Sequence, residues 1–271
     1  AEAIQDSAHG VGYWSDHWTY LVDLLIQYAA VFPDRLGGLF TDRSYSFFDP
    51  THRLAPRERK YVVTPAGVRQ YGAVLWSDEK KALLDSRSAH RYKVRAQAGR
   101  GDVVHTTLLG KILTLVANKL ATLDPFGVGI EMEADRPGWC DALNGLPGIF
   151  GSSVNETIEL RRLADFTRRA MPAGEGECPL PGELAAFVVH LGDLLHRDDL
   201  APIGFWRAAG ALKEGYRASV FMGFSGAEAT MSFADVRRFL ADVSGFLDQA
   251  IARACTPQGV VTDFACEVAE Y

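Results

Sequence analysis

The feature that most constrains the fold is a regular apolar spacing near the C-terminus. Apolar residues recur there every three or four positions: Val236, Phe239, Leu240, Val243, Phe246, Leu247 and Ala250. This is the spacing of one buried face of an α-helix. The sequence therefore predicts a helix from Phe233 to Cys255, and its period is the cleanest in the chain.

Similar but weaker patterns occur along most of the chain. They predict helices over 17–32, 104–123, 153–171, 184–197 and 202–220, with a shorter one at 78–86. Pro33 and Pro125 end two of these helices, and Pro202 occupies the first turn of another. Ser153 with Glu156 three residues later is typical of a capping box. The 104–123 helix has a widened apolar stripe, which predicts burial on more than one side.

The signal for strands is weak. A short strand is predicted at 129–134, and 96–102 is predicted to be a loop. Residues 33–67 hold four prolines and mixed aromatics, which predicts a long ordered excursion without regular elements. About six long helices with long functional loops and a few short strands predict an all-α fold of helical hairpins. No repeat of fixed period is visible, which argues against a short-repeat solenoid.

Composition excludes several functional classes. The 271 residues include 28 Lys and Arg against 34 Asp and Glu, a net charge of −6, without the basic surface that a nucleic-acid binder needs. No apolar run approaches the ~18 residues of a membrane span. The four cysteines are far apart in the sequence, which fits reduced cytoplasmic thiols better than disulfides or zinc: Cys140, Cys178, Cys255 and Cys266. We therefore expect a cytoplasmic protein with no nucleic-acid or membrane partner and no metal.

The organisation predicted for residues 1–271 is a single domain that is itself partial. The chain has no initiator Met, and its last residues alternate like an unfinished strand. The expected partners are thus the remainder of a longer chain or further copies of the same chain.

The loop RPGWCDALNGLPGIFGSS at 136–153 is both turn-rich and apolar, so we expect it to be held against the protein body. Within it, Asp141 lies two residues after Trp139. A carboxyl beside an indole in a partly dry loop has a raised pKa, as a general acid near neutral pH requires. The alternative is that Asp141 caps a short turn and Trp139 belongs to the core.

A second constellation lies near the N-terminus. Five of its residues have the composition of a sugar site, with aromatic faces for pyranose rings and polar groups for hydroxyls: Tyr13, Trp14, Asp16, His17 and Trp18. The alternative is structural. Trp14 and Trp18 then pack together at a helix start, and Asp16 complements the helix dipole.

Several stretches of the sequence resemble those of a known enzyme family. The stretch PGWCDALNGLPG resembles the loop of cellobiose-phosphorylase-type inverting glycoside phosphorylases, and less closely the SGWD loop of trehalase-like and glucosidase-like enzymes. GYWSDHWTY, GVRQYGA and ANKLATLDPFGVGIEME extend the similarity over residues 10–170. The resemblance implies a six-hairpin α/α toroid, of which this chain is a part.

The resemblance also implies site residues. Asp141 takes the position of the general acid, with Trp139 and Asn144 beside it in the loop. Cys140 stands where the phosphorylase loop has Asn, which leaves the subfamily and the donor sugar open. In the GVRQYGA stretch, Arg69 and Gln70 are candidates for binding phosphate or a sugar hydroxyl; the alternative is a simple loop salt bridge.

A second carboxylate is needed only if water, rather than phosphate, attacks the sugar. Candidates are Asp16, Glu131 and Glu133, although the two glutamates have an alternative role at a solvated strand edge. The predicted function is an enzyme that cleaves a glycosidic bond with inversion, as a phosphorylase of a β-linked glucoside or oligosaccharide. Inorganic phosphate is its co-substrate, and no cofactor is expected. The alternatives are an inverting toroid glycoside hydrolase and a non-catalytic helical domain that binds a saccharide or a partner.

Overall fold

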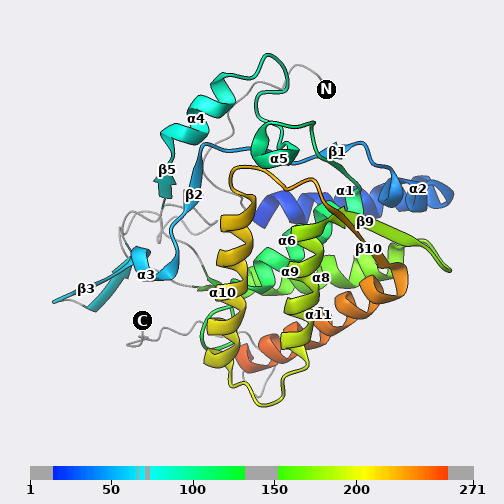
Figure 1. Cartoon of the computed structure of the whole chain (residues 1–271). Helices are drawn as coiled ribbons and strands as arrows, with labels where there is room; N and C mark the ends of the chain where they lie inside the picture. Colours follow the sequence, from blue (N-terminus) through cyan, green and yellow to red (C-terminus); the bar gives the residue numbers. More distant parts are fainter. Residues whose placement is uncertain (1–14, 66, 71–73, 132–151, 256–271) are drawn as a thin grey trace.

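The computed structural model describes residues 15–65, 67–70, 74–131 and 152–255 (Figure 1). This part of the chain is mostly helical and carries a few short strands. The predicted class, a mainly helical fold with short strands, is confirmed at that level.

Six of the described helices have thirteen residues or more: α1 (Ser15–Val31), α6 (Leu108–Leu120), α8 (Val154–Ala170), α9 (Gly182–Leu195), α10 (Pro202–Val220) and α11 (Phe233–Ala254). Each matches a predicted helix, and the short helix predicted at 78–86 is α4 (Asp78–Asp85). The largest error is the start of α6. Thr107 caps this helix by accepting a hydrogen bond from Gly110 N at 3.0 Å, and the residues before it belong to strand β6 (His105–Thr106).

The helix caps explain where two other long helices begin. Ser232 Oγ accepts a hydrogen bond from Asp235 N at 3.0 Å at the start of α11. Ser153 Oγ accepts from Glu156 N at 3.3 Å at the start of α8, as the capping-box pattern predicts. Such caps satisfy amide groups that the first helical turn leaves without partners.

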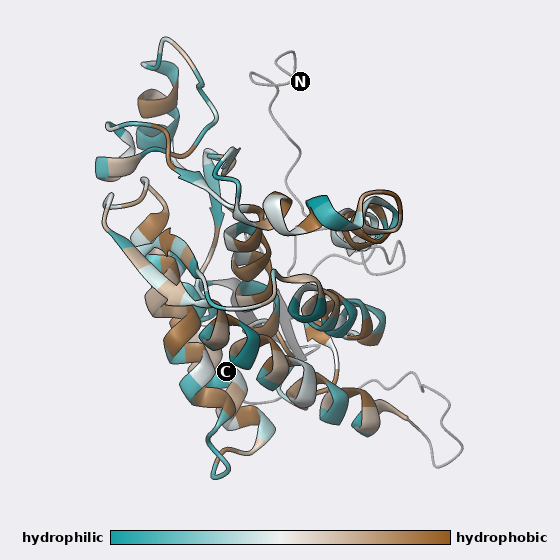
Figure 2. Ribbon diagram, turned by 90° about the vertical axis from the view of Figure 1, so that its right-hand side faces the viewer, coloured by the Kyte–Doolittle hydropathy of each residue, from teal (hydrophilic) through white to brown (hydrophobic). Residues whose placement is uncertain are grey.

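Two of the long helices, α8 and α9, contact α6 and connect it to the others. Helix α8 contacts α1, α6 and α11, while α9 contacts α6, α10 and α11 (Figure 1). Burial of α6 on more than one side is confirmed, because eight of its thirteen residues are buried. In Figure 2 the helices carry both hydrophobic and hydrophilic residues along their length, as amphipathic helices do.

The prediction that residues 33–67 lack regular elements is wrong. This stretch contains η2 (Pro33–Arg35), α2 (Leu36–Thr41), β1 (Tyr45–Ser46), β2 (His52–Leu54), α3 (Arg57–Lys60) and β3 (Tyr61–Thr64). Each element has two to six residues. Periodicity is counted over longer windows than that, so such elements leave no clear pattern in the sequence.

The described strands form five two-stranded antiparallel pairs, β1–β6, β2–β5, β3–β4, β7–β8 and β9–β10. The remaining strands are β4 (Gly67–Gln70), β5 (Val74–Trp76), β7 (Ile130–Glu131), β8 (Ser152–Ser153), β9 (Glu177–Pro181) and β10 (Glu228–Ser232). The strand predicted at 129–134 is confirmed over β7, and 132–134 lie outside the described residues. The β3–β4 hairpin projects from the helical body (Figure 1).

The loop predicted at 96–102 begins with a tight turn, α5 (Ala96–Gly99), against which the chain after α10 is packed. Gly223 has a φ of 136°, and a Cβ there would lie 2.4 Å from Arg95 O. Only glycine fits such a conformation and approach. Phe224 N then donates to Arg95 O at 3.1 Å, which fixes the loop that follows α10.

Candidate functional site

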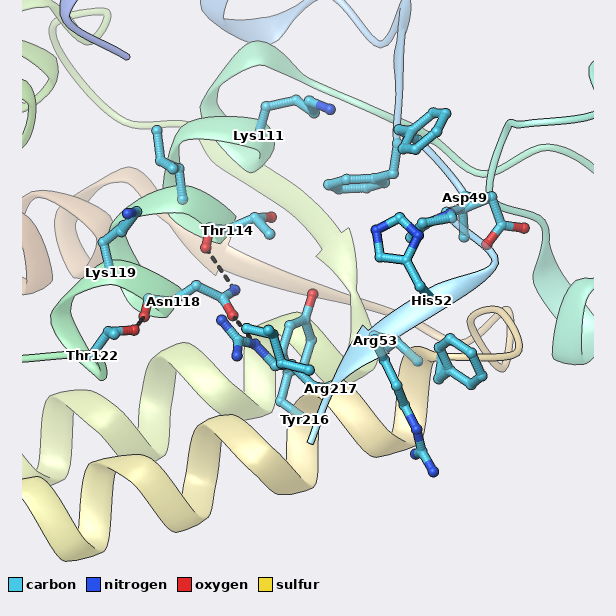
Figure 3. Close-up of a pocket in the computed structure, with 18 of the residues that line it drawn as sticks. Asp49, His52, Arg53, Lys111, Thr114, Asn118, Lys119, Thr122, Tyr216 and Arg217 are labelled. Atoms are coloured by element: carbon cyan, nitrogen blue, oxygen red, sulfur yellow. Dashed lines mark hydrogen bonds between the residues drawn. The ribbon is translucent and has the colours of Figure 1, made fainter. Parts of the chain in front are cut away.

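A cavity of about 440 Å³ lies between α6, α10 and the segment 47–54 (Figure 3). Its aromatic lining residues are Phe47, Phe48, Tyr216, Phe221 and Phe224. Its charged lining residues are Asp49, Arg53, Lys111, Lys119, Glu131, Glu156 and Arg217. Ligand sites combine apolar walls with a few converging polar groups in this way, and a volume of this size holds a small molecule.

One face of α6 supplies a polar wall of the cavity. Four residues of the helix form this wall: Lys111, Thr114, Asn118 and Lys119. Thr122 extends the wall just after the helix ends. The two lysines are the only charged residues in α6, a helix that is otherwise mostly buried. This polar stripe is visible in the sequence as the complement of the apolar one, but its residues are not among the predicted site residues.

Hydrogen bonds fix the part of this wall near the C-terminal end of α6. Asn118 Nδ2 donates to Thr114 O at 2.9 Å, and Arg217 Nε donates to Asn118 Oδ1 at 3.3 Å (Figure 3). The buried Lys213 donates from Nζ to Thr122 Oγ1 at 3.1 Å. Helices α6 and α10 are thereby joined through polar groups beside the cavity.

Lys119 is neutralised by the protein. Its Nζ lies 2.9 Å from Glu156 Oε2 and 5.0 Å from the ring centroid of Trp18. Trp18 is 1% exposed and belongs to the core, so it contacts the cavity wall through Lys119. A ring with so little exposed surface offers no face for stacking on a sugar, so the position of Trp18 fits the structural alternative given for it in the sequence.

The surroundings of Lys111 are different. Its Nζ donates to Ser46 O at 2.9 Å and lies 4.7 Å from the ring centroid of Phe47. Burial lowers the pKa of Lys111 to about 8, because the charged form loses its hydration. Among the described residues, no carboxylate forms an ion pair with it to offset this loss.

We therefore expect Lys111→Met to stabilise the fold at neutral pH, by about 1–3 kcal/mol in the free energy of unfolding. The unfolded chain holds the Lys111 proton up to the usual pKa near 10.5, whereas the folded chain loses it near 8. The stability of the wild type therefore rises between these two pH values, and the advantage of the variant shrinks. Urea unfolding at about pH 7 and pH 10 measures both effects. A variant that is less stable at neutral pH would contradict this prediction.

Asp49 lines the cavity but is committed to the structure. Its two carboxylate oxygens lie 2.6 Å from Lys80 Nζ and 2.9 Å from an Arg87 guanidinium nitrogen. The exposed fractions of the three side chains are 0–4%. Lys80 also donates to Phe221 O at 2.7 Å, so this buried cluster ties α4 to the cavity wall.

The aromatic walls are held by ring contacts. Phe47 and Phe224 have ring centroids 5.5 Å apart, and Tyr216 stacks on Phe187 at 4.8 Å. The Tyr216 hydroxyl points into the space beside α6 (Figure 3). Burial, with a smaller effect from Glu183, raises the pKa of Tyr216, so this hydroxyl stays protonated and can donate a hydrogen bond.

Glu131 is the one predicted site residue whose described side chain lines the cavity. It is 6% exposed, so the alternative of a solvated strand edge is wrong for this residue. Glu131 pairs in register with Ser152 across strands β7 and β8. The segment 132–151 is therefore joined to the described part of the chain at two neighbouring points beside the cavity.

Asp124 secures those two points. Its carboxylate accepts hydrogen bonds from Val128 N at 3.0 Å, Gly129 N at 2.9 Å and Ser152 Oγ at 2.6 Å. Asp124 is 4% exposed. A buried carboxylate with several donors is well solvated by the protein, so this contact rigidly connects the turn before β7 to the start of β8.

The other predicted site residues are not tested by the structure. The backbones of Asp16 and His17 lie in the first turn of α1, and those of Arg69 and Gln70 lie in β4; the side chains of all four are outside the description. Six more residues lie outside the described residues altogether: Tyr13, Trp14, Glu133, Trp139, Asp141 and Asn144.

Comparison with known proteins does not identify a family. No protein-family model matches the chain, and no curated protein matches it. Among the described residues, no three His, Cys, Asp or Glu side chains gather where they could hold a metal ion. No helix in the described ranges combines the length and the apolar character needed to cross a membrane. Cys178 and Cys255 are free thiols, and burial raises the pKa of Cys178 to about 11.

Proposed function

We propose that this chain belongs to a carbohydrate-active enzyme that cleaves a glycosidic bond with inversion, using inorganic phosphate to cleave a β-linked glucoside. The observation that carries the proposal is the pairing of Glu131 with Ser152. It joins the segment 132–151, which holds Asp141, to the wall of a cavity of about 440 Å³.

The composition of the cavity supports a sugar as the ligand. Aromatic rings such as Phe47 and Tyr216 suit the apolar faces of a pyranose. Polar groups on α6, such as Thr114 and Asn118, are placed among them to bond with hydroxyls. Small-molecule sites gain orientation from a few such polar groups on a largely apolar surface.

In the proposed mechanism, Asp141 is protonated in the resting enzyme and donates its proton to the glycosidic oxygen. Phosphate attacks the anomeric carbon from the opposite face, the carbon–oxygen bond breaks, and the configuration is inverted. Phosphate is already anionic and needs no base. A β-glucoside therefore yields an α-glucosyl phosphate and a free acceptor with its hydroxyl restored.

Inverting hydrolysis is the second candidate, and the buried position of Glu131 favours it. In such a hydrolase Glu131 removes a proton from water while Asp141 protonates the leaving oxygen. The two carboxyl groups then stand ~6.5–9.5 Å apart, which leaves space for the water molecule. Glu131 is the predicted base candidate whose described side chain lines the cavity.

For the fold, we propose that the helices form part of an α/α toroid. The support is the set of six long helices, α1, α6, α8, α9, α10 and α11, which are joined through the contacts of α8 and α9. A six-hairpin toroid needs twice that number. Helices from the remainder of a longer chain, or from another copy, supply the rest in this proposal.

The test is a turnover assay of the full-length protein with a panel of β-glucosides, with and without inorganic phosphate. We expect phosphate consumption matched by formation of an α-glucosyl phosphate. Release of free glucose without phosphate consumption would instead support the hydrolase, and Glu131→Gln should then abolish it. Saccharide binding without turnover would support the non-catalytic alternative. The absence of both binding and turnover would contradict the whole proposal.

A further inference from the structure

The cavity contains a cation that the described part of the fold does not neutralise. Lys111 Nζ has the Ser46 carbonyl as a hydrogen-bond acceptor, at 2.9 Å. An ammonium carries three donor hydrogens, so this contact leaves two for a ligand. Figure 3 shows Lys111 extending from α6 at the edge of the cavity.

The other cations of the lining are engaged differently. Lys119 is paired with Glu156 at 2.9 Å, and Arg217 donates to Asn118 at 3.3 Å. The Arg53 guanidinium lies 5.1 Å from the ring of Phe221 and points away from α6 (Figure 3). An anion that enters the cavity therefore reaches Lys111 without displacing a described carboxylate.

The charge of the cavity contrasts with that of the protein. Four cationic and three carboxylate side chains line it, although the chain as a whole has a net charge of −6. A local excess of positive charge in a concave site attracts an anion. Lys111 supplies one positive charge beside an apolar ring, and one negative charge balances it. A phosphate dianion there would leave a buried charge without a partner, which is costly.

We propose that the ligand of this cavity is an acidic saccharide, whose carboxylate forms an ion pair with Lys111 Nζ. This inference rests on the proposed function and names its substrate class. The carboxylate accepts the two hydrogens that Ser46 leaves, and the aromatic wall contacts the sugar ring. The unfavourable burial of Lys111 is then offset when the ligand binds.

Calorimetric titration with two matched probes tests the proposal. Methyl β-D-glucuronoside and methyl β-D-glucoside differ at one carbon, which carries a carboxylate in the first and a hydroxymethyl group in the second. We expect the glucuronoside to bind at least about 10-fold more tightly, as a charge-assisted hydrogen bond warrants. Lys111→Met should remove this preference, whereas Lys111→Arg should keep part of it.

Two controls separate charge recognition from general effects. Lys81→Met removes a positive charge from an exposed lysine, with a side chain 62% accessible, and should leave the preference unchanged. A second readout needs no variant. Acylation of lysines in the wild type, followed by mass spectrometry, should show that the glucuronoside protects Lys111 and does not protect Lys81.

Three results would overturn the proposal. The first is equal binding of the two glycosides. The second is a preference for the glucuronoside that survives in Lys111→Met. The third is binding of inorganic phosphate that depends on Lys111, while the glucuronoside does not bind. If the neutral glucoside binds and is cleaved in the first or third case, the proposed function stands and only this inference fails. If neither glycoside binds and the full-length protein cleaves none, both fail.

Discussion

Asp141→Asn in the full-length protein is expected to lower the turnover of its glycoside by about 100- to 10,000-fold, the usual contribution of a positioned general acid. Asparagine has nearly the size of aspartate but cannot donate the proton that the leaving oxygen needs. Because the change alters protonation rather than shape, the affinity for the sugar should stay within a few-fold of the wild type. Initial rates and calorimetric titration of the same preparations measure the two quantities.

The matched control for this variant is Asp193→Asn. Asp193 is an exposed residue on α9, away from the residues that line the cavity, and the same substitution there should leave turnover unchanged. A leaving group with a low pKa needs less help from a proton donor. The turnover of a substrate with such a leaving group should therefore fall less in Asp141→Asn than the turnover of a substrate whose leaving group has a high pKa. Equal losses for both substrates, or full activity of the variant, would exclude Asp141 as the acid.

Asp49→Asn is expected to lower the free energy of unfolding by about 3–5 kcal/mol. The substitution leaves Lys80 and Arg87, which are 0% and 4% exposed, without their shared carboxylate. Removing one partner of a buried ion pair is costly, since the remaining charge has lost its hydration and gains nothing in return. Urea unfolding followed by circular dichroism measures the change.

Asp85→Asn provides the control for Asp49→Asn, because Asp85 also binds one lysine and one arginine. Its partners are Lys81 and Arg91, but the carboxylate is 37% exposed. Water screens an exposed pair, so this substitution should cost no more than about 1 kcal/mol. Similar losses for the two variants would show that burial of the Asp49 cluster does not determine its strength.

The sequence by itself determined the six long helices. Their signal is local, because an apolar residue on each turn, a serine cap or a proline acts within the helix that it belongs to. The start of α8 at Ser153 and the span of α11 follow from such residues alone. The exception is α6, where residues before Thr107 pair with β1, and that pairing is not local.

The short strands were decided by tertiary structure. Tyr45 pairs with Thr106, and Glu228 with Pro181, across separations in which no repeated pattern indicates the partner. Each strand has at most five residues, too few for an alternation to stand out. The β9–β10 pair packs against α9 and α11, and this packing stabilises a two-stranded ribbon that is marginal by itself.

For the candidate site, too, the sequence indicated some features and the tertiary structure determined the others. The sequence indicated Glu131 as a carboxylate of interest, but only the fold determined that it is buried in a cavity beside Ser152. Lys111 escaped notice because a lysine in an apolar helix is ordinarily solvated. Its character comes from Ser46 and Phe47, which lie more than sixty positions earlier in the chain. Local periodicity determines a helix, whereas the hydration and pairing of a charge depend on everything that the fold packs around it.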